Sequence, residues 1–263
     1  MSTQSAISKL AAAAVIMCPV AVAHAGGFVA PQPDPVIVAP IQEEVSNGWE
    51  GAYVGAALGY AMNGDDRVGV FNRDAGQSDF AFQGDIGTLR PKGPFLALRG
   101  GYRWERNKWV IGPELEVHGG NIDDEVSRDF SDDGVTAMAS AKIKEKYAVS
   151  LRMKTGYQLR PDTIVYGIAG IAHGKFDYDL AETGTDDDGR YAIGLGSGFS
   201  STGYVVGLGA ERKLNERLSL TGDVEYYNYG KTEITWTDAE GDSVQTNATP
   251  DYWALKLGLN YQF

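Results

Sequence analysis

The sequence has a single cysteine, only three histidines and few basic residues for its length of 263. Its 23 Lys and Arg are outnumbered by 35 Asp and Glu, which gives a formal net charge of −12. A chain this acidic is a poor partner for nucleic acid, because binding to phosphates depends on Lys and Arg. The sequence also lacks the G-x-S-x-G, H-E-x-x-H, P-loop and C-x-x-C motifs. It therefore offers no familiar catalytic or nucleotide-binding arrangement, and we expect no cofactor.

The start of the chain has the features of a secretory signal. Lys9 precedes a short apolar stretch that ends in AHA, with Ala23 and Ala25 placed as a signal-peptidase site requires. The stretch is interrupted by Pro19, which disfavours a permanent transmembrane helix. We predict a cleaved signal peptide over residues 1–25. Its removal takes away the single cysteine, so disulfides and thiolate chemistry are excluded.

Residues 26–48 are rich in proline and show no regular alternation of apolar and polar residues. Such a composition predicts an extended linker in polyproline-like conformations. Two interpretations of this linker remain open. It is either a plain spacer or a tail that binds peptidoglycan or another partner.

From Trp49 onward the sequence alternates apolar and polar residues and shows no convincing helical period. A period of two is typical of β-strands with one apolar and one polar face. No uncharged apolar run in this region is long enough to cross a membrane as a helix. The alternation recurs in eight stretches, which we predict to be strands: AYVGAALGYAM (52–62), FLALRGGYRW (95–104), WVIGPELEVHG (109–119), YAVSLRMKTGYQ (147–158), IVYGIAGIAHGKF (164–176), GYVVGLGAERKL (203–214), LSLTGDVEYYNYG (218–230) and ALKLGLNYQF (254–263).

The stretch 164–176 is the most ambiguous of the eight. We place Ile164, Tyr166, Ile168 and Phe176 together on its apolar face.

Alternation alone fits a soluble β-sandwich as well as a membrane barrel. The polar faces carry glycine and charges of both signs, which suits a narrow lumen in which buried charges pair. If ERNK closes a tight hairpin with Glu105 opposite Lys108, then Arg99 falls directly opposite Glu114. The predicted lumen charge network comprises Arg99, Arg103, Glu114, Glu116, Arg152, Lys154, Glu211, Asp223 and Glu225.

Aromatic residues and connection lengths also favour a membrane barrel. The connections ERNK, LRPDT and LNER are short, whereas the segments near 63–93, 120–142, 178–201 and 230–250 are long and acidic. Short turns at one rim and long loops at the other are typical of transmembrane barrels, and a closed barrel satisfies every backbone hydrogen bond in lipid. Aromatic residues gather at the strand ends, as interfacial girdles require: Trp49, Tyr60, Trp104, Trp109, Tyr157 and Trp253.

The sequence therefore predicts an all-β fold, an eight-stranded antiparallel transmembrane β-barrel over residues 49–263. With the signal peptide, this places the protein in the outer membrane of a Gram-negative bacterium, with the linker in the periplasm.

Three segments resemble the small opacity-type outer-membrane β-barrel proteins, a porin family of alphaproteobacteria. They are WEGAYVGAALGY, GYVVGLGAERKLNERLSLTGDVEYYNYG and the terminal LKLGLNYQF. The resemblance implies eight strands and insertion by the barrel-assembly machinery, which reads Phe263 with support from Leu259 and Tyr261. It also implies an abundant surface protein with a structural, envelope-stabilising or adhesive role. Some members of this family are called porins.

One acidic segment, DFSDDG, resembles the first half of a calcium loop, with Asp129, Ser131 and Asp133 two residues apart before a glycine. The twelfth position is Ser140 and not the bidentate Glu, so we expect a solvated acidic loop and at most weak metal binding. We hypothesise that this segment and TDDDG (185–189) interact with divalent cations at the lipopolysaccharide surface.

The two remaining histidines, His118 and His173, are predicted to point inward as satisfied lumen residues. A lipid-modifying enzyme would need a Ser–His pair on the outer face, and the sequence offers none. We therefore predict that the protein is not an enzyme. The leading interpretation is a structural or surface-interaction barrel that contacts lipid, lipopolysaccharide and an external ligand. The alternative is a narrow pore, because inward glycines leave gaps: Gly55, Gly59, Gly101, Gly207 and Gly209.

Overall fold

The computed structural model describes residues 48–132, 135–186 and 189–263. The predicted signal peptide and nearly all of the predicted linker lie outside these residues. The described part of the chain holds no helix long and apolar enough to span a membrane. It consists of thirteen β-strands: β1 (Gly51–Met62), β2 (Asp66–Arg73), β3 (Ala81–Leu89), β4 (Gly93–Arg106), β5 (Trp109–Gly120), β6 (Ile122–Asp132), β7 (Val135–Arg160), β8 (Thr163–Asp186), β9 (Gly189–Lys213), β10 (Leu218–Asn228), β11 (Thr232–Thr237), β12 (Ser243–Ala248) and β13 (Asp251–Gln262).

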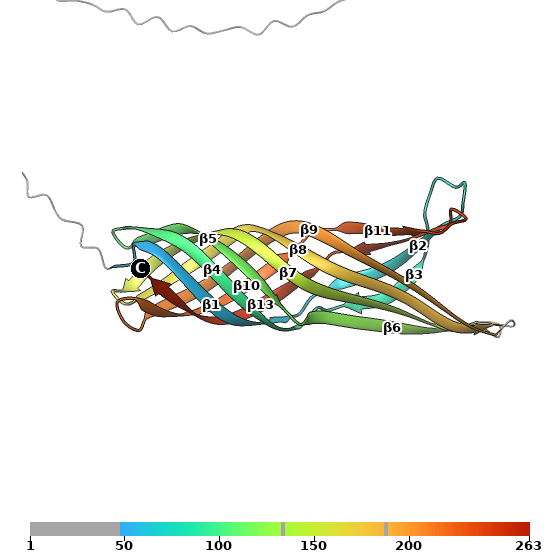
Figure 1. Ribbon diagram of the computed structural model, residues 1–263, viewed down its shortest axis with the longest axis horizontal. Helices are drawn as coiled ribbons and strands as arrows, with labels where there is room; N and C mark the ends of the chain where they lie inside the picture. Colours follow the sequence, from blue (N-terminus) through green and yellow to red (C-terminus); the bar gives the residue numbers. More distant parts are fainter. Residues whose placement is uncertain (1–47, 133–134, 187–188) are drawn as a thin grey trace, which may run out of the picture. The chain divides into compact units, whose positions relative to one another are not determined.

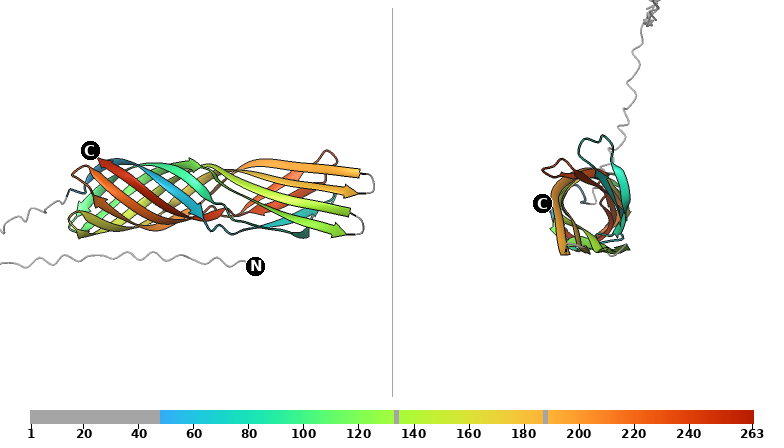
Figure 2. Two further views of the ribbon diagram at one scale, coloured as in Figure 1. Left: turned by 90° about the horizontal axis from the view of Figure 1, so that it is seen from below. Right: turned by 90° about the vertical axis from the view of Figure 1, so that its right-hand side faces the viewer.

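Eight of these strands close into a ring. Neighbours follow the order β5-β4-β1-β13-β10-β9-β8-β7, and β7 pairs again with β5. Every pair in the ring is antiparallel. Figure 1 shows the strands tilted around a common axis, and the end-on view in Figure 2 shows that they enclose it. The predicted eight-stranded antiparallel barrel is confirmed.

The strand β7 has two successive neighbours on one edge. Its second half pairs with β5, from Trp109↔Tyr157 to His118↔Ala148, and its first half pairs with β6. The chain between β5 and β6 runs against the start of β4, where Gly93 has a φ of 140°. A side chain at Gly93 would collide with the carbonyl oxygen of Asn121, so this crossing requires glycine.

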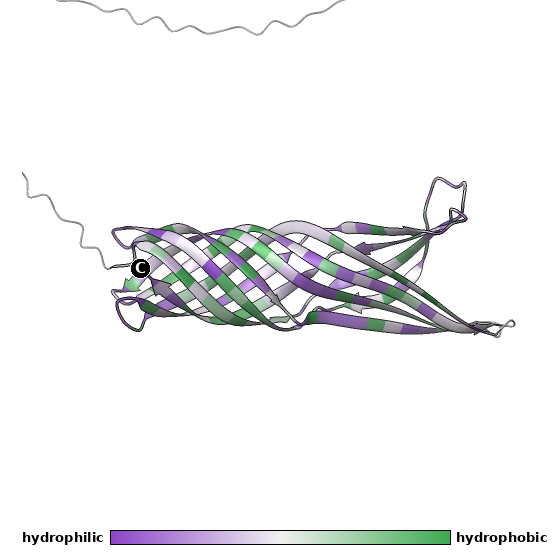
Figure 3. Cartoon of the chain, viewed as in Figure 1, coloured by the Kyte–Doolittle hydropathy of each residue, from purple (hydrophilic) through white to green (hydrophobic). Residues whose placement is uncertain are grey.

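Beyond the closed ring, β6, β7, β8 and β9 continue outward, and a second sheet of order β11-β12-β2-β3 lies opposite them. The expectation of long loops in this region is therefore wrong, because most of those residues are in strands. The extended strands pair with one another: Met138 on β7 pairs with Thr183 on β8, and Thr183 pairs with Ala192 on β9. These backbone hydrogen bonds form although the segments are rich in polar residues. Apolar residues are concentrated on the ring, whereas β6 is largely hydrophilic (Figure 3).

The apolar faces of most ring strands point outward, as predicted. Leu58, Leu208 and Leu257 are 71%, 72% and 62% exposed. The terminal strand β13 alternates along its length, with Lys256 buried between exposed Leu255 and Leu257, and Asn260 buried between exposed Leu259 and Tyr261. An outer surface of exposed leucines is stable only against lipid.

The facing predicted for β8 is wrong. Its inward face carries Ile164, Tyr166, Ile168 and Phe176, all at most 5% exposed, while the opposite face, with Ile171 among its residues, points outward. Both faces of this stretch are apolar, so alternation alone does not fix which of them meets lipid.

The predicted β4–β5 hairpin is also shifted. Arg106 pairs with Trp109, so the turn is the dipeptide Asn107–Lys108, and Arg99 lies opposite Glu116 and not Glu114. Asn107 adopts a φ of 56°, a left-handed conformation that asparagine tolerates and that two-residue hairpin turns favour.

Candidate functional site

All nine residues of the predicted charge network lie inside the ring, and none is more than 8% exposed. They project from five strands: Arg99 and Arg103 from β4, Glu114 and Glu116 from β5, Arg152 and Lys154 from β7, Glu211 from β9, and Asp223 and Glu225 from β10. The alternation of each strand places these side chains inward, since their sequence neighbours face lipid.

Arg152 is the centre of the network. Its Nη1 donates to Glu225 Oε2 at 2.8 Å, and its Nε donates to Glu114 Oε1 at 3.0 Å. Its Nη2 contacts Glu116 as well. One guanidinium thus holds three carboxylates from two strands, in the forked geometry that arginine offers and lysine does not.

Lys256 on β13 completes this centre, although the sequence prediction left it out of the network. Its Nζ lies 2.7 Å from both Glu116 Oε1 and Glu225 Oε2, and the residue is 1% exposed. Its place between Leu255 and Leu257, on the polar face of the last strand, was the signal that could have identified it.

Two further ion pairs lie nearer the short turns. Arg99 Nη1 donates to Asp223 Oδ2 at 3.0 Å, and Arg103 Nη2 donates to Glu211 Oε2 at 2.9 Å. Lys154 Nζ lies 2.9 Å from Glu114 Oε2. With Lys256 included, five cations therefore face five carboxylates. Such a balance is what a water-poor interior requires, because an unpaired buried charge costs several kcal/mol.

Aromatic side chains close both ends of this charged core. At the turn end, Trp49 is fully buried and does not belong to a girdle, contrary to prediction. Its indole Nε1 donates to the Pro161 carbonyl at 3.2 Å, and Lys213 Nζ lies 4.6 Å from its ring centroid. Arg103 lies 3.9 Å from the ring centroid of Tyr53.

At the other end of the core, His118 is buried and hydrogen bonded to the hydroxyl of Tyr252 at 2.9 Å. That hydroxyl also donates to Glu145 Oε2 at 3.0 Å, and the ring of Tyr227 stacks on Tyr252 at 5.3 Å. Tyr252 and Glu145 were not predicted from the sequence, because both lie outside the stretches predicted to be strands.

The inward glycines do not leave gaps, contrary to expectation. A side chain at Gly59 would collide with the ring of Phe95, and one at Gly209 would collide with Tyr166. These glycines make room for large neighbours. A cavity beside Arg103 and Lys154 has a volume of only about 10 Å³, close to the space of one water molecule.

His173 points outward, which corrects the inward placement. Its Nδ1 lies 2.7 Å from Thr202 Oγ1 on the exposed face. A histidine that activates a hydroxyl nucleophile is itself oriented by a third group. Within the described residues, the hydrogen-bond partner of the His173 ring is Thr202 alone. The pair is therefore a surface hydrogen bond.

The candidate metal ligands are only partly described. Asp129 and Ser131 lie on β6, and Asp133 falls outside the described residues. Across the described ranges, no group of three or more His, Cys, Asp or Glu side chains is arranged to hold a metal ion.

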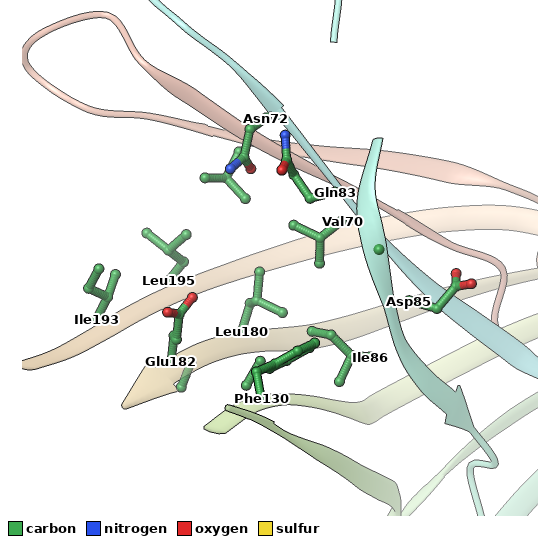
Figure 4. Close-up of a pocket in the computed structure, with 14 residues that line it drawn as sticks. Val70, Asn72, Gln83, Asp85, Ile86, Phe130, Leu180, Glu182, Ile193 and Leu195 are labelled. Carbon is green, nitrogen blue, oxygen red and sulfur yellow. The ribbon is translucent and has the colours of Figure 1, made fainter. Parts of the chain in front are cut away.

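A second candidate site is a cavity of about 430 Å³ between the two sheets beyond the ring. Side chains from both sheets point into it (Figure 4). We call it the outer cavity. Its lining comprises Val70, Asn72, Gln83, Gly84, Asp85, Ile86, Phe130, Ala139, Leu180, Ala181, Glu182, Ile193, Leu195 and Val244.

The family described as outer membrane protein beta-barrel domain matches residues 10–263 of this sequence. The chain belongs to this outer-membrane β-barrel family. It is 25% identical over 245 residues to the 31 kDa outer-membrane immunogenic protein of Brucella melitensis biotype 1, covering 92% of this chain and 93% of that protein. It is 24% identical over 232 residues to the 25 kDa outer-membrane immunogenic protein of Brucella abortus biovar 1, covering 88% and 87%.

The crystal structure of the outer membrane protein OprG from Pseudomonas aeruginosa shares the fold of this outer-membrane barrel. The TM-score is 0.50 at 15% identity, with 81% of this chain and 96% of that chain covered. In outer-membrane barrels the short turns are periplasmic and the long connections extracellular. The outer cavity and the second sheet are therefore extracellular.

Two aromatic girdles mark the membrane boundaries. The ring centroids of Trp253 and Tyr226 lie 5.2 Å apart on the extracellular side, and Trp109 and Tyr157 meet edge to face at 5.2 Å on the periplasmic side. On β13, Trp253 and Tyr261 are eight residues apart, about 27 Å of strand. A tilt of about 40° makes this ~20 Å of membrane, near the apolar band of other such barrels.

The predicted assembly signal lies on the last strand and directly after it. Leu259 and Tyr261 point outward from β13, Phe263 is 76% exposed, and the rings of Tyr261 and Phe263 meet edge to face at 5.5 Å.

Proposed function

We propose that this outer-membrane barrel is a non-enzymatic surface protein, with a packed polar core as its lumen and acidic extracellular strands as its contact surface. The observation that carries the proposal is the charge balance of the lumen. Five cations and five carboxylates satisfy one another there, and these residues are at most 8% exposed. An enzyme or a channel keeps such groups accessible to its substrate or solute.

The extracellular segments 63–93, 120–142, 178–201 and 230–250 supply the contact surface. Together they contain twenty acidic and eight basic residues, a net charge of −12 that equals that of the whole chain. Because most of these residues are in paired strands, the surface is stiff and projects from the membrane. A stiff acidic surface suits a cationic partner, in a structural or adhesive role. Relatives named outer-membrane immunogenic proteins are compatible with such exposure.

Lipopolysaccharide is the second partner in this proposal. Lys144, Lys146 and Lys175 are exposed on β7 and β8 beside the exposed Tyr147, which pairs with Lys175. Lys146 Nζ also lies 2.8 Å from Asp177 Oδ2, so part of its charge is already offset. His173 lies on the same outward face. These four residues, which we call the basic patch, would lie at the height of the lipid phosphates in the outer leaflet: Lys144, Lys146, His173 and Lys175. Lys and Arg close to an anionic surface contribute about 1 kcal/mol each.

The barrel-assembly machinery is the third proposed partner. The outward aromatic and apolar side chains of β13, together with Phe263, would be its contact on the unfolded precursor.

Solute uptake by liposomes tests the closed lumen. The mature chain is refolded, its folding is checked by the gel shift between boiled and unboiled samples, and swelling in arabinose and in sucrose is recorded beside a wide porin. We expect uptake no faster than in empty liposomes. A variant with Arg99→Ser and Asp223→Ser removes an opposed pair without stranding a charge, and should admit arabinose.

Arabinose uptake by the wild-type barrel, with sucrose excluded, would replace this proposal with the narrow-pore alternative.

A further inference from the structure

We propose that the outer cavity binds an uncharged, mainly apolar small molecule. This inference goes beyond the proposed surface role and does not depend on a closed lumen. The cavity lies between β2, β3 and β12 on one side and β6, β7, β8 and β9 on the other (Figure 4). No described backbone ladder joins the two sheets across it.

The lining is apolar although it lies outside the membrane. Nine of its fourteen residues are Val, Ile, Leu, Phe or Ala. Ile193 and Phe130 are 55% and 43% exposed, while Ile86 and Leu180 form a buried part of the wall. Apolar area in contact with water costs about 25 cal/mol per Å². Concave surfaces of this kind, away from lipid, are characteristic of ligand sites.

The size of the outer cavity fits a small molecule. Its volume of about 430 Å³ lies in the range of roughly 300–1,000 Å³ that such sites occupy. Side chains that line it come from both sheets, so a ligand would be held between two walls.

The polar groups of the lining select against an anion. None of the fourteen lining residues is Lys, Arg or His, whereas two are carboxylates, Asp85 and Glu182. Asp85 is paired with Arg67, and Glu182 accepts a hydrogen bond from the Tyr191 hydroxyl at 2.8 Å. The side-chain amides of Asn72 and Gln83 can serve an alcohol, phenol or amide group. The preferred ligand is therefore neutral, with an apolar body and one hydrogen-bonding group.

The outer cavity is closed toward the lumen. The buried apolar cluster that includes Ile86 and Leu180 continues to Ile143 and Tyr178, which are 1% and 0% exposed. A ligand would therefore enter from and leave to the extracellular medium. Binding at this site predicts no transport, so its outcome is independent of liposome uptake.

The test compares two probes that differ in charge, 2-naphthol and 2-naphthoate, on methyl-labelled full-length mature barrel in lipid nanodiscs at pH 7. We expect 2-naphthol to shift the methyl signals of Ile86, Leu180 and Leu195, and these shifts should saturate as its concentration rises. The methyl signals of lipid-facing Leu257 should change only in proportion to the amount of probe dissolved in the lipid, without saturation. Binding of 2-naphthoate should be at least tenfold weaker.

A filled cavity provides the control. Ala139→Phe places a ring in the site and should weaken 2-naphthol binding at least tenfold, whereas Ala192→Phe adds the same ring at an exposed position and should leave binding unchanged. If Ala139→Phe does not fold, Ile193→Asn, at a half-exposed position, should weaken binding at least threefold. Unsaturable shifts that are alike at Leu180 and Leu257, equal binding of both probes, or unchanged binding by the folded variant would each overturn the proposal.

Discussion

At the scale of single residues, the lumen depends on mutual compensation and not on any one strong pair. Lys256 serves Glu116 and Glu225, both of which also contact Arg152. A buried ion pair contributes little net stability compared with an apolar pair of the same shape, but removing one partner strands the other. The effect of a substitution here therefore depends on what it leaves unpaired.

We predict that Lys256→Met lowers the free energy of unfolding by about 3–5 kcal/mol, because two carboxylates then share one arginine. Urea titration of the barrel in lipid vesicles, followed by the gel shift, measures this. The double variant Lys256→Met with Glu225→Gln restores the charge balance and should recover at least half of the loss. Lys231→Met, at an exposed extracellular lysine, is the control, with an expected change within about 0.5 kcal/mol. A loss below 1 kcal/mol for the single variant would contradict the compensated network.

At the scale of elements, the sequence was informative where one face was apolar and the other polar. Strands β1, β4, β5 and β13 have this character, and their facing followed from alternation alone. It did not suffice for β8, where both faces are apolar and only packing against Asp223 and other neighbours decides that Tyr166 points inward. A two-residue hairpin slip preserved the facing but changed the partner of Arg99.

The site was predictable to a similar extent. Charge on the polar face identified the nine network residues, whereas the aromatic ends of the core required the three-dimensional arrangement. Tyr252, Trp49 and Glu145 come from segments assigned to strand ends or loops. The extracellular strands were unpredictable for the same reason, since their pairing depends on neighbours that continue from the ring.

Asp66, at the start of extracellular β2, makes the stability of the second sheet, β11-β12-β2-β3, depend on pH. It is 1% exposed, and its Oδ1 accepts the backbone N–H of Thr249 at 2.8 Å. Within the described part of the chain, its Oδ2 has no hydrogen-bond partner. Burial, opposed by the hydrogen bond from the Thr249 N–H and assisted by the nearby carboxylates of Asp251 and Asp65, raises the pKa of Asp66 to about 7. The folded protein thus favours the protonated acid, so the stabilisation is complete below about pH 4, declines as pH rises to about 7, and is lost above it.

We predict that β2 and β12 are more protected from amide hydrogen exchange at pH 5.5 than at pH 8, after correction for intrinsic rates. The full effect is on the order of 4 kcal/mol for the group as a whole, and about half of it falls between these two pH values. Asp66→Asn should remove the difference, whereas Asp79→Asn, in the loop between β2 and β3, should keep it. Equal protection of the wild-type sheet at both pH values would contradict this assignment.

At the scale of the whole molecule, charge is distributed by compartment. The lumen is balanced and the extracellular strands carry the acidic excess. In the proposed role, the basic patch lies at the boundary between lipid and water. Acidic strands above an anionic leaflet would be repelled from it, so cations at the girdle are needed to offset this repulsion. Lys144 and Lys175 lie close together on β7 and β8, since Lys144 pairs with Asp177 and Tyr147 with Lys175, and one pair, Glu145 with Phe176, lies between these two.

We predict that the double variant Lys144→Glu with Lys175→Glu binds phosphorylated lipid A at least tenfold more weakly, as expected if each lysine contributes about 1 kcal/mol. Native mass spectrometry counts the bound lipid, and a melting curve in lipid A vesicles should fall below that of the wild type. With dephosphorylated lipid A the two proteins should behave alike. Lys108→Glu, in a periplasmic turn, is the matched control and should leave binding unchanged. If the double variant retains lipid A with its phosphates as tightly as the wild type does, the basic patch is not what holds the barrel against the outer leaflet.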